Sequence, residues 1–329
     1  MYKTGRSHEM ILAVSKLKNL PSPPVGYRGR FAPSPTGPLH AGSLVAALGS
    51  WLDARKNGGK WLLRIEDLDG PRCVPGVDFQ IQNQLLACGL KWDGETTWQS
   101  QSQDGYQKAL EALNTLQLLY PCSCSRQTIA HTLAQRGIQI ARNQEMVYPG
   151  TCRPAQLKTH TSSELENTRL TWRLTLPSNC EITFEDLVLG PQKQDLTQEV
   201  GDFALRRNDG IFTYQLAVVV DDALQGITHI VRGADLLSNT ARQIHLQNVM
   251  GLARPQYLHL PLVLDEYGEK LSKQNQATPI QTQTETEALA ELRKAAKHLG
   301  LRELPDGANV TISEWLLAAT QAWSSKLPN

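Results

Sequence analysis

The sequence predicts an α/β protein built on an open parallel sheet, and three observations indicate this class. An extended, proline-rich segment at residues 31–39 leads directly into a helical pattern. A Gly-Gly turn then precedes an apolar strand at residues 60–65, which completes a strand–helix–strand opening. The runs at residues 217–220 and 227–231 are apolar enough to be strands buried on both faces. With 329 residues, the chain can bury a large core in one domain with an insertion or in two domains.

Composition limits the compartment and the kind of partner. The 33 basic and 32 acidic residues nearly cancel, so any contact with nucleic acid must be local. The six cysteines are scattered unevenly and do not resemble a disulfide framework, which favours a reducing compartment. The apolar run at residues 11–14 is too short for a signal peptide, and no segment approaches the roughly 20 apolar residues of a membrane span. We therefore expect a cytoplasmic protein with no membrane partner, acting as a monomer.

The first segment of interest is the junction between the proline-rich loop and the first helix. The three prolines in residues 31–39 exclude a helix there, because proline fixes φ and lacks an N–H. From Gly42 onward, apolar residues recur at helical spacing until the stop at residues 57–59. Free N–H groups and the positive end of the helix dipole would meet a phosphate at this junction. His40 and Ser43 are candidate donors beside it.

Two carboxylates follow the strand at residues 60–65. Glu66 and Asp67 stand at its carboxyl end, the edge at which open α/β sheets bind ligands. A carboxylate in that position suits a ligand with an ammonium group. The alternative interpretation is a solvated turn before Pro71.

Three cysteines gather in the middle of the chain. Cys122 and Cys124 are two residues apart, a spacing at which both thiolates can share one tetrahedral zinc ion, and Cys152 can join them. His131 and His160 are generic candidates for a fourth ligand. Reduced cysteines in a small subdomain without metal are the alternative.

The second half of the chain alternates strand and helix signals. Residues 170–176 and 181–189 are rich in β-branched residues and predict strands of an inserted subdomain. Asn-Asp-Gly at residues 208–210 predicts a hairpin turn, with Tyr214 on the returning strand. Ser238 is a candidate helix cap. Helical periodicity predicts helices at residues 79–89, 106–119, 240–250, 287–299 and 312–323.

Four short stretches, taken together, resemble the signatures of class I aminoacyl-tRNA synthetases. His-Ala-Gly-Ser at residues 40–43 resembles the first nucleotide-binding signature. Lys-Leu-Ser-Lys-Gln at residues 270–274, after the apolar run 258–264, resembles the second. Arg-Phe-Ala-Pro-Ser-Pro-Thr-Gly at residues 30–37 and Arg-Ile-Glu-Asp at residues 64–67 point to the glutamyl branch.

The resemblance covers residues 29–274 and departs from the signatures at two positions. Ser43 stands where many class I enzymes carry a second histidine, and Gln274 replaces the terminal serine of the second signature. Neither change removes the main phosphate ligands.

The resemblance implies a Rossmann-type class I synthetase catalytic domain, with an inserted zinc-bearing subdomain and a short helical C-terminal part. We divide the chain into a flexible N-terminal extension (1–27), the first catalytic half (28–120), the insertion (121–200), the second catalytic half (201–274) and a helical region (275–329). The last region has 55 residues, too few for an anticodon-binding domain. This truncated plan resembles the glutamyl-Q tRNA(Asp) synthetases.

Members of that family activate glutamate with ATP and Mg²⁺ and transfer it to the queuosine base in the anticodon loop of tRNA-Asp. The resemblance therefore implies three partners: L-glutamate, ATP and the anticodon stem-loop of tRNA-Asp. Two other functions stay open at this point. One is an ordinary glutamyl-tRNA synthetase that charges a tRNA 3′ end, and the other is a non-catalytic nucleotide- or zinc-binding paralogue.

The resemblance also implies site residues. Glutamate would be bound by Arg30, Phe31, Ala32, Pro33, Ser34, Glu66, Tyr214 and Arg232. ATP would be bound by His40, Gly42, Ser43, Lys270, Ser272 and Lys273. His40 and Lys273 would be catalytic, holding the triphosphate from opposite sides. The family would place Tyr148 beside Cys122, Cys124 and Cys152 around one structural Zn²⁺.

Overall fold

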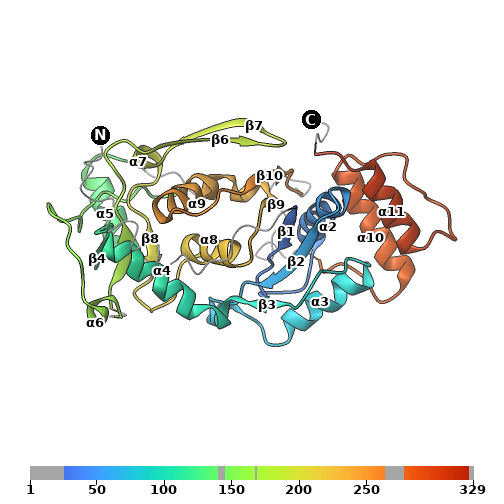
Figure 1. Ribbon diagram of the computed structural model, residues 1–329, viewed down its shortest axis with the longest axis horizontal. Coiled ribbons are helices and arrows are strands. Elements are labelled where there is room, and N and C mark those ends of the chain that lie inside the picture. Colours follow the sequence, from blue (N-terminus) through green and yellow to red (C-terminus); the bar gives the residue numbers. More distant parts are fainter. Residues whose placement is uncertain (1–25, 140–144, 167–168, 264–277, 326–329) are drawn as a thin grey trace.

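The computed structural model describes residues 26–139, 145–166, 169–263 and 278–325. Its strands are β1 (Arg28–Phe31), β2 (Lys60–Ile65), β3 (Thr97–Trp98), β4 (Leu119–Cys122), β5 (Thr171–Leu174), β6 (Glu181–Asp186), β7 (Gly190–Asp195), β8 (Ala204–Arg206), β9 (His229–Gly233) and β10 (Gln256–Leu260). Its α-helices are α2 (Ala41–Lys56), α3 (Val77–Ala87), α4 (Gln103–Thr115), α5 (Arg126–Gln135), α6 (Ser162–Leu165), α7 (Leu196–Glu199), α8 (Tyr214–Leu224), α9 (Leu237–Met250), α10 (Glu285–His298) and α11 (Ile312–Ala322). Figure 1 shows α10 and α11 at one end of the molecule, β4 and α5 at the other, and α8 and α9 between them.

Two strand groups lie side by side as a mostly parallel sheet that joins the two predicted catalytic halves. One has the order β1-β2-β3 and the other the order β7-β6-β10-β9, with β9 and β10 parallel. The groups adjoin along β1 and β9, where the Thr228 N–H donates to the Arg28 carbonyl oxygen at 2.9 Å. From this line the chain continues outward from β1 to β2 on one side and from β9 to β10 on the other. Open α/β sheets bind ligands at such a switch point, beyond the carboxyl ends of the strands.

The C-terminal helices share a core with α2. Leu48 and Leu52 of α2 are fully buried in the same apolar cluster as Leu292 of α10 and Trp315 of α11. Each fully buried leucine contributes about 1.5 to 3 kcal/mol through removal of apolar surface from water. The two predicted helices at the end of the chain are confirmed, and they stabilise the helix on which the active-site loop depends.

One predicted strand is wrong. The run at residues 217–220 lies in α8, and Tyr214 is the first residue of that helix. A short apolar run is compatible with a buried strand or a buried helix, and periodicity alone does not separate them. Here α8 packs against α4 and α9, so both faces of the run are covered and no polar stripe marks the helix.

A separate antiparallel sheet has the order β4-β5-β8. Strand β5 falls within the predicted insertion (121–200), whereas β8 follows it in the sequence. The predicted turn at residues 208–210 is confirmed by a bridge between Arg206 and Phe212. The β6–β7 hairpin, which the sequence places in the insertion, pairs through Asp186 with Tyr257 of β10. It therefore extends the catalytic sheet.

The other predicted elements agree with the structure within a few residues at most ends. The strand at residues 60–65 is β2, and α3, α4, α10 and α11 coincide with predicted helices. The predicted helix at 240–250 begins earlier, at Leu237, because the 3₁₀ turn Ala234–Leu236 runs directly into it, so Ser238 lies in the first turn instead of capping it. Among the described helices, none is long and apolar enough to cross a membrane.

Candidate active site and thiol cluster

A cleft of about 560 Å³ opens at the carboxyl ends of β1, β2, β9 and β10. All eight residues predicted to bind glutamate line it: Arg30, Phe31, Ala32, Pro33, Ser34, Glu66, Tyr214 and Arg232. The predicted nucleotide residues His40, Gly42 and Ser43 line the same cleft. Lys270, Ser272 and Lys273 lie outside the described residues. The sheet edge thus gathers side chains that are as many as 202 positions apart in the sequence, from Arg30 to Arg232.

The side chain of His40 begins helix α2. Its Nδ1 accepts hydrogen bonds from the N–H groups of Gly42 at 3.2 Å and Ser43 at 3.4 Å. The Ser43 hydroxyl completes this capping box, because it accepts from the His40 N–H at 2.7 Å and donates to the His40 carbonyl oxygen at 2.8 Å. Since Nδ1 accepts, the ring proton is on Nε2. His40 is therefore a neutral donor at Nε2, while Ser43 hydrogen-bonds to its own loop.

A buried charge cluster lies beside the cleft. Asp222 pairs with Arg30 Nε at 3.1 Å and with Arg64 Nη1 at 2.8 Å. Arg64 also lies 3.7 Å from Asp221 and 3.5 Å from Glu66. The two arginines and the two aspartates balance in charge. An ionised Glu66 gives this cluster a net charge of one negative unit, which is complementary to an ammonium ligand.

Glu66 titrates near neutral pH. Burial raises its pKa to about 7, against the opposing effect of Arg64 and Arg30, and Asp222 adds to the rise. The free cleft therefore holds a carboxyl group that is about half protonated at pH 7. A bound ammonium group would favour the ionised form.

Arg232 supplies the other buried cation of the cleft, with only 4% of its surface exposed. Its guanidinium donates to neutral acceptors only: His259 Nε2, Tyr214 Oη, Gln243 Oε1, Thr240 Oγ1 and the Leu236 carbonyl oxygen. None of the ion pairs between described residues includes Arg232. A buried guanidinium that has no carboxylate partner among the described residues favours an anionic ligand, because the ligand would compensate its charge.

Sequence reasoning assigned no role to Arg64 as an ion-pair partner, or to His259 and Asp186 behind Arg232. A weak signal exists for two of them. Arg64 interrupts the apolar run Trp-Leu-Leu-Arg-Ile, and His259 interrupts Leu-His-Leu. A polar residue inside a buried strand must find a partner, so such an interruption marks a buried polar network.

The four predicted zinc ligands converge despite their separation in the sequence. The sulfur atoms of Cys122, Cys124 and Cys152 lie within 4.8 Å of one another, with Cys124 and Cys152 at 3.4 Å. The Tyr148 oxygen lies 3.3 Å from the Cys122 sulfur and 3.9 Å from the Cys124 sulfur. Neighbouring ligands of a tetrahedral zinc are separated by about 1.6 times the metal–ligand distance, or ~3.8 Å for Zn–S bonds of ~2.3 Å. The donors and their spacing fit a zinc ion.

Backbone contacts hold Tyr148 in this cluster. Its N–H donates to the Val200 carbonyl oxygen at 3.1 Å. Gly201, at φ 73°, passes so close that a Cβ would lie 2.5 Å from the Tyr148 carbonyl oxygen. Any side chain at that position would push the tyrosine away. The ligand cluster found among the described residues contains neither His131 nor His160.

The thiols of the cluster differ in acidity. Burial raises the pKa of Cys124 to about 11. Burial acts in the same direction on Cys152, but a hydrogen bond from the Ser123 backbone and contacts with the other members outweigh it and lower the pKa to about 7. The thiolate is the form that ligates a metal. Cys152 is thus more acidic than Cys124.

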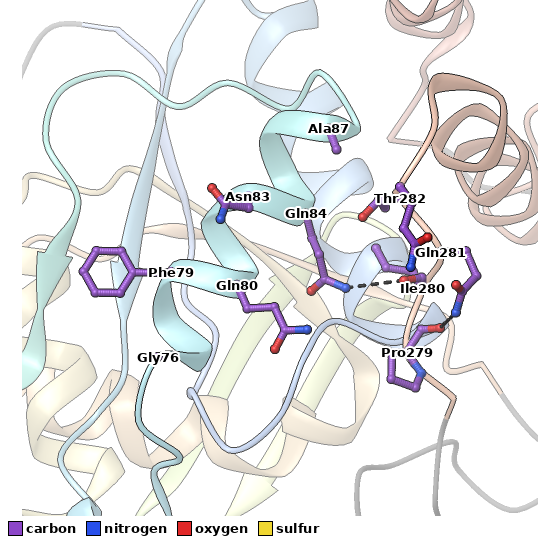
Figure 2. A pocket seen from close by; sticks show the side chains of 11 residues that line it. Gly76, Phe79, Gln80, Asn83, Gln84, Ala87, Pro279, Ile280, Gln281 and Thr282 are labelled. Atoms are coloured by element: carbon purple, nitrogen blue, oxygen red, sulfur yellow. Dashed lines mark hydrogen bonds between the residues drawn. The ribbon is translucent and has the colours of Figure 1, made fainter.

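A second cavity, of about 510 Å³, lies between α3 and residues 279–283, as Figure 2 shows. Gln84 forms its inner wall and is only 6% exposed. Its Oε1 accepts from the Leu39 N–H at 2.8 Å, and its Nε2 donates to the Ile280 carbonyl oxygen at 3.4 Å. The Ile280 N–H in turn donates to the Leu39 carbonyl oxygen at 2.9 Å. Gln84 therefore ties the loop before His40 to the segment that follows the second predicted signature.

This fold and this cleft are those of a class I aminoacyl-tRNA synthetase catalytic domain. The sequence profile of the family described as tRNA synthetases class I (E and Q), catalytic domain, matches residues 27–305. Among solved structures, a glutamate tRNA ligase from Elizabethkingia meningosepticum, in complex with its amino acid, is similar with a TM-score of 0.63 and 32% identity. The match covers 76% of this chain and 52% of that one, so the chain spans about half the length of this solved relative.

Curated relatives narrow the class further. The chain is 51% identical over 312 residues to the glutamyl-Q tRNA(Asp) synthetase of Albidiferax ferrireducens, covering 91% of this chain and 99% of the relative. It is 51% identical over 303 residues to the enzyme of that name from Burkholderia cenocepacia, covering 92% and 97%. The chain therefore belongs to the family of glutamyl-Q tRNA(Asp) synthetases. The family predicted from the four signature stretches is confirmed.

Proposed function

We propose that this chain activates L-glutamate with ATP as glutamyl-adenylate and transfers the glutamyl group to the queuosine base in the anticodon loop of tRNA-Asp. One observation carries the proposal. All eight residues expected to bind glutamate line a single cleft, in a chain that matches glutamyl-Q tRNA(Asp) synthetases over nearly their whole length.

The charges of the cleft match those of glutamate. Arg30 and Arg232 would bind the side-chain carboxylate, since guanidinium groups recognise carboxylates through paired hydrogen bonds. Glu66 would bind the α-ammonium group, and Ser34 and Tyr214 would add neutral hydrogen bonds. Glutamine is a poorer ligand, because its amide N–H groups would face guanidinium donors.

ATP would lie against the start of α2. His40 Nε2 would donate to the triphosphate, with Gly42 and Ser43 beneath it, and Lys270, Ser272 and Lys273 would approach from the other side. An oxygen of the α-carboxylate of glutamate attacks the α-phosphate in line, a new P–O bond forms, the bond from the α-phosphorus to the bridging oxygen breaks, and pyrophosphate leaves with Mg²⁺. Catalysis here is positioning plus stabilisation of charge that develops on the phosphates.

In the second step, a hydroxyl group of queuosine attacks the acyl carbonyl carbon, and AMP leaves. The RNA must bring its anticodon loop to the cleft, and the chain carries a net charge of only +1. Local basic contacts would then hold the stem-loop, with weak binding that falls as salt rises. We infer that one chain suffices for both steps.

We also infer one structural Zn²⁺ in the insertion, bound by Cys122, Cys124, Tyr148 and Cys152. The metal would cross-link the segment of Cys122 and Cys124 to the segment of Tyr148 and Cys152, which also meet in a small apolar cluster. Three thiolates and a phenolate leave no position open for water, so this zinc would have no part in the chemistry.

Two assays test the function. The first is exchange of pyrophosphate into ATP, which we expect with glutamate and without RNA. Exchange with glutamine alone, or only after addition of tRNA, contradicts the proposed activation step. Glu66→Gln serves as a control with a raised KM for glutamate, because it removes the carboxylate partner of the ammonium group.

The second assay offers radiolabelled glutamate with three RNAs: tRNA-Asp that carries queuosine, tRNA-Asp that lacks it, and tRNA-Glu. We expect label on the first only. Label at the 3′ end of tRNA-Glu would instead make the chain an ordinary glutamyl-tRNA synthetase.

A further inference from the structure

A line of buried side chains connects β6 to the glutamate cleft. Asp186, the last residue of β6, has its Oδ2 2.6 Å from His259 Nδ1. His259 Nε2 lies 3.1 Å from Arg232 Nε. Asp186 is 1% exposed and His259 is 0% exposed, so water does not reach this line.

The geometry fixes the protonation of His259. Because Nε2 accepts from the Arg232 guanidinium, the ring proton must be on Nδ1, where it is donated to the Asp186 carboxylate. A doubly protonated ring would set its Nε2–H against the Arg232 Nε–H. His259 is therefore neutral and passes the effect of the Asp186 charge to Arg232 through two hydrogen bonds.

Asp186 is held rigidly in turn. Its Oδ1 accepts from the backbone N–H groups of Leu189 at 2.9 Å and Val188 at 3.1 Å, in the turn between β6 and β7. The hairpin lies along the edge of the sheet beside β10 (Figure 1). The carboxylate is thus a fixed anchor and cannot swing into the cleft.

The contacts of Arg232 fall into two groups. On the inner side, three bonds of 2.8 to 3.1 Å join it to His259, Gln243 and Thr240. Toward the cleft, two longer bonds of 3.2 and 3.4 Å reach Tyr214 and the Leu236 carbonyl oxygen, both of which belong to residues that line it. The inner bonds fix the plane of the guanidinium, and the outer ones are the weaker set that an incoming carboxylate can replace.

We propose that Asp186 and His259 are positioning residues that hold the Arg232 guanidinium in the plane required to bind the side-chain carboxylate of glutamate. The arrangement keeps the cation fixed without neutralising it by direct contact, since the carboxylate is one imidazole ring away. Arg232 therefore retains its charge for the substrate. The inference rests on the proposed function, and it deepens it by naming residues behind the cleft that determine the preference for glutamate over glutamine.

Four variants test the proposal. Asp186→Asn removes the charge and lets an amide N–H donate to Nδ1, which moves the ring proton to Nε2, toward Arg232. His259→Leu removes the acceptor altogether, whereas His259→Gln restores an acceptor near the position of Nε2. Glu185→Gln is the matched control, because it changes a carboxylate one residue earlier on β6 that is exposed. Thermal melting of each variant checks that it folds.

The measurements are the Kd of glutamate and of glutamine by calorimetry, and KM and kcat in pyrophosphate exchange. In Asp186→Asn and His259→Leu we expect the glutamate Kd and KM to rise about tenfold or more, by analogy with the loss seen when hydrogen bonds that orient the ligands of a metal site are removed. The KM of ATP should stay within about twofold, the preference for glutamate over glutamine should fall, and His259→Gln should recover most of the loss.

Three results overturn the proposal. One is a glutamate Kd within about twofold of wild type in folded Asp186→Asn and His259→Leu. Another is an equal rise in the KM of ATP, which indicates general damage, and the third is His259→Gln behaving like His259→Leu. Should Asp186→Asn fail to fold, the two His259 variants decide. A wild type that binds glutamate without exchange refutes the proposed function alone, since the Kd values still judge the inference.

Discussion

Glu66 makes the binding of glutamate depend on pH near neutrality. Its pKa is about 7 in the free cleft, chiefly because the carboxyl group is buried. Only the ionised form attracts the α-ammonium group of the substrate. With that pKa, about 90% of the chains carry the charge at pH 8 and about 9% at pH 6. If glutamate binds only the ionised form, its KM rises about tenfold on going from pH 8 to pH 6.

The effect of pH on the free energy of unfolding has the opposite sign to its effect on glutamate binding. The pKa of Glu66 is raised from 4.5 in the unfolded chain to about 7, so the folded state holds the proton more tightly. Stability from this group is therefore present below pH 4.5 and is lost as the pH rises through 7. The raised pKa corresponds to roughly 3 kcal/mol. Glu66→Gln should then be more stable than wild type at pH 8, and lose that advantage at pH 5.

The assay is pyrophosphate exchange at saturating ATP, with KM for glutamate measured at half-unit steps from pH 6 to 8.5. Thermal melting of wild type and Glu66→Gln from pH 5 to pH 8.5 follows stability. In Glu66→Gln the KM should be high at every pH and nearly flat. A wild-type KM that changes less than about twofold from pH 8 to pH 6, or an equal slope in Glu66→Gln, would refute the assignment of this titration to Glu66.

Three further predictions concern His40, Gln84 and the proposed zinc site. His40→Asn should keep the melting temperature, since asparagine is a good N-cap, but should lose the rate of glutamate activation. His40→Ala should lose that rate and also about 1 kcal/mol of stability. A His40→Asn enzyme with full activity contradicts the role of His40 in binding phosphate. Gln84→Leu leaves the Leu39 N–H buried without its acceptor, which should lower stability by about 1 to 3 kcal/mol in thermal melting and raise the KM of ATP. Asn83→Leu, on the same cavity, is the control. Equal melting and KM values in the two variants would show that Gln84 does not hold the two segments together. Metal analysis should give about one zinc per chain and less in Cys122→Ser, and an unchanged content in that variant excludes the proposed site.

The parts of the fold that local rules govern could be predicted from sequence. The start of α2 is marked by the proline loop and by the donors at His40 and Ser43. Helices α10 and α11 each begin with a capping box, built on Thr284 and on Thr311, followed by apolar residues at helical spacing. In α8 the local signal fails, because residues 218–220 are three valines, which favour a strand, and tertiary packing overrides that preference.

The gathering of the site could be predicted only by resemblance. Nothing in the spacing between Cys124 and Tyr148 says that they meet, because their approach depends on Gly201, a residue far along the chain that admits the tyrosine backbone. The same holds for the pairing of Arg30 with Asp222, which lie 192 positions apart. Motifs identify the residues that touch a ligand, but the partners that set their charge come from elements that the motif does not contain.

Partners outside the motifs explain why the charges of Arg30 and Arg232 are compensated to different degrees, although both side chains face one cleft. Arg30 is paired directly with Asp222 at 3.1 Å, so part of its field is already compensated. Arg232 has an imidazole between itself and its nearest carboxylate along the hydrogen-bonded line, so more of its charge is available to a ligand. Since a buried charge without compensation is costly, the cleft is less stable empty than filled by an anion. Glu66 can become neutral by taking up a proton near neutral pH, which removes the cost of its buried charge. A guanidinium does not give up its proton, so Arg232 stays charged. The empty cleft can therefore remove its uncompensated charge at Glu66, where the ammonium group would bind, but not at Arg232, where the side-chain carboxylate would bind. Selection for an acidic side chain thus rests on Arg232 and on the residues that hold it.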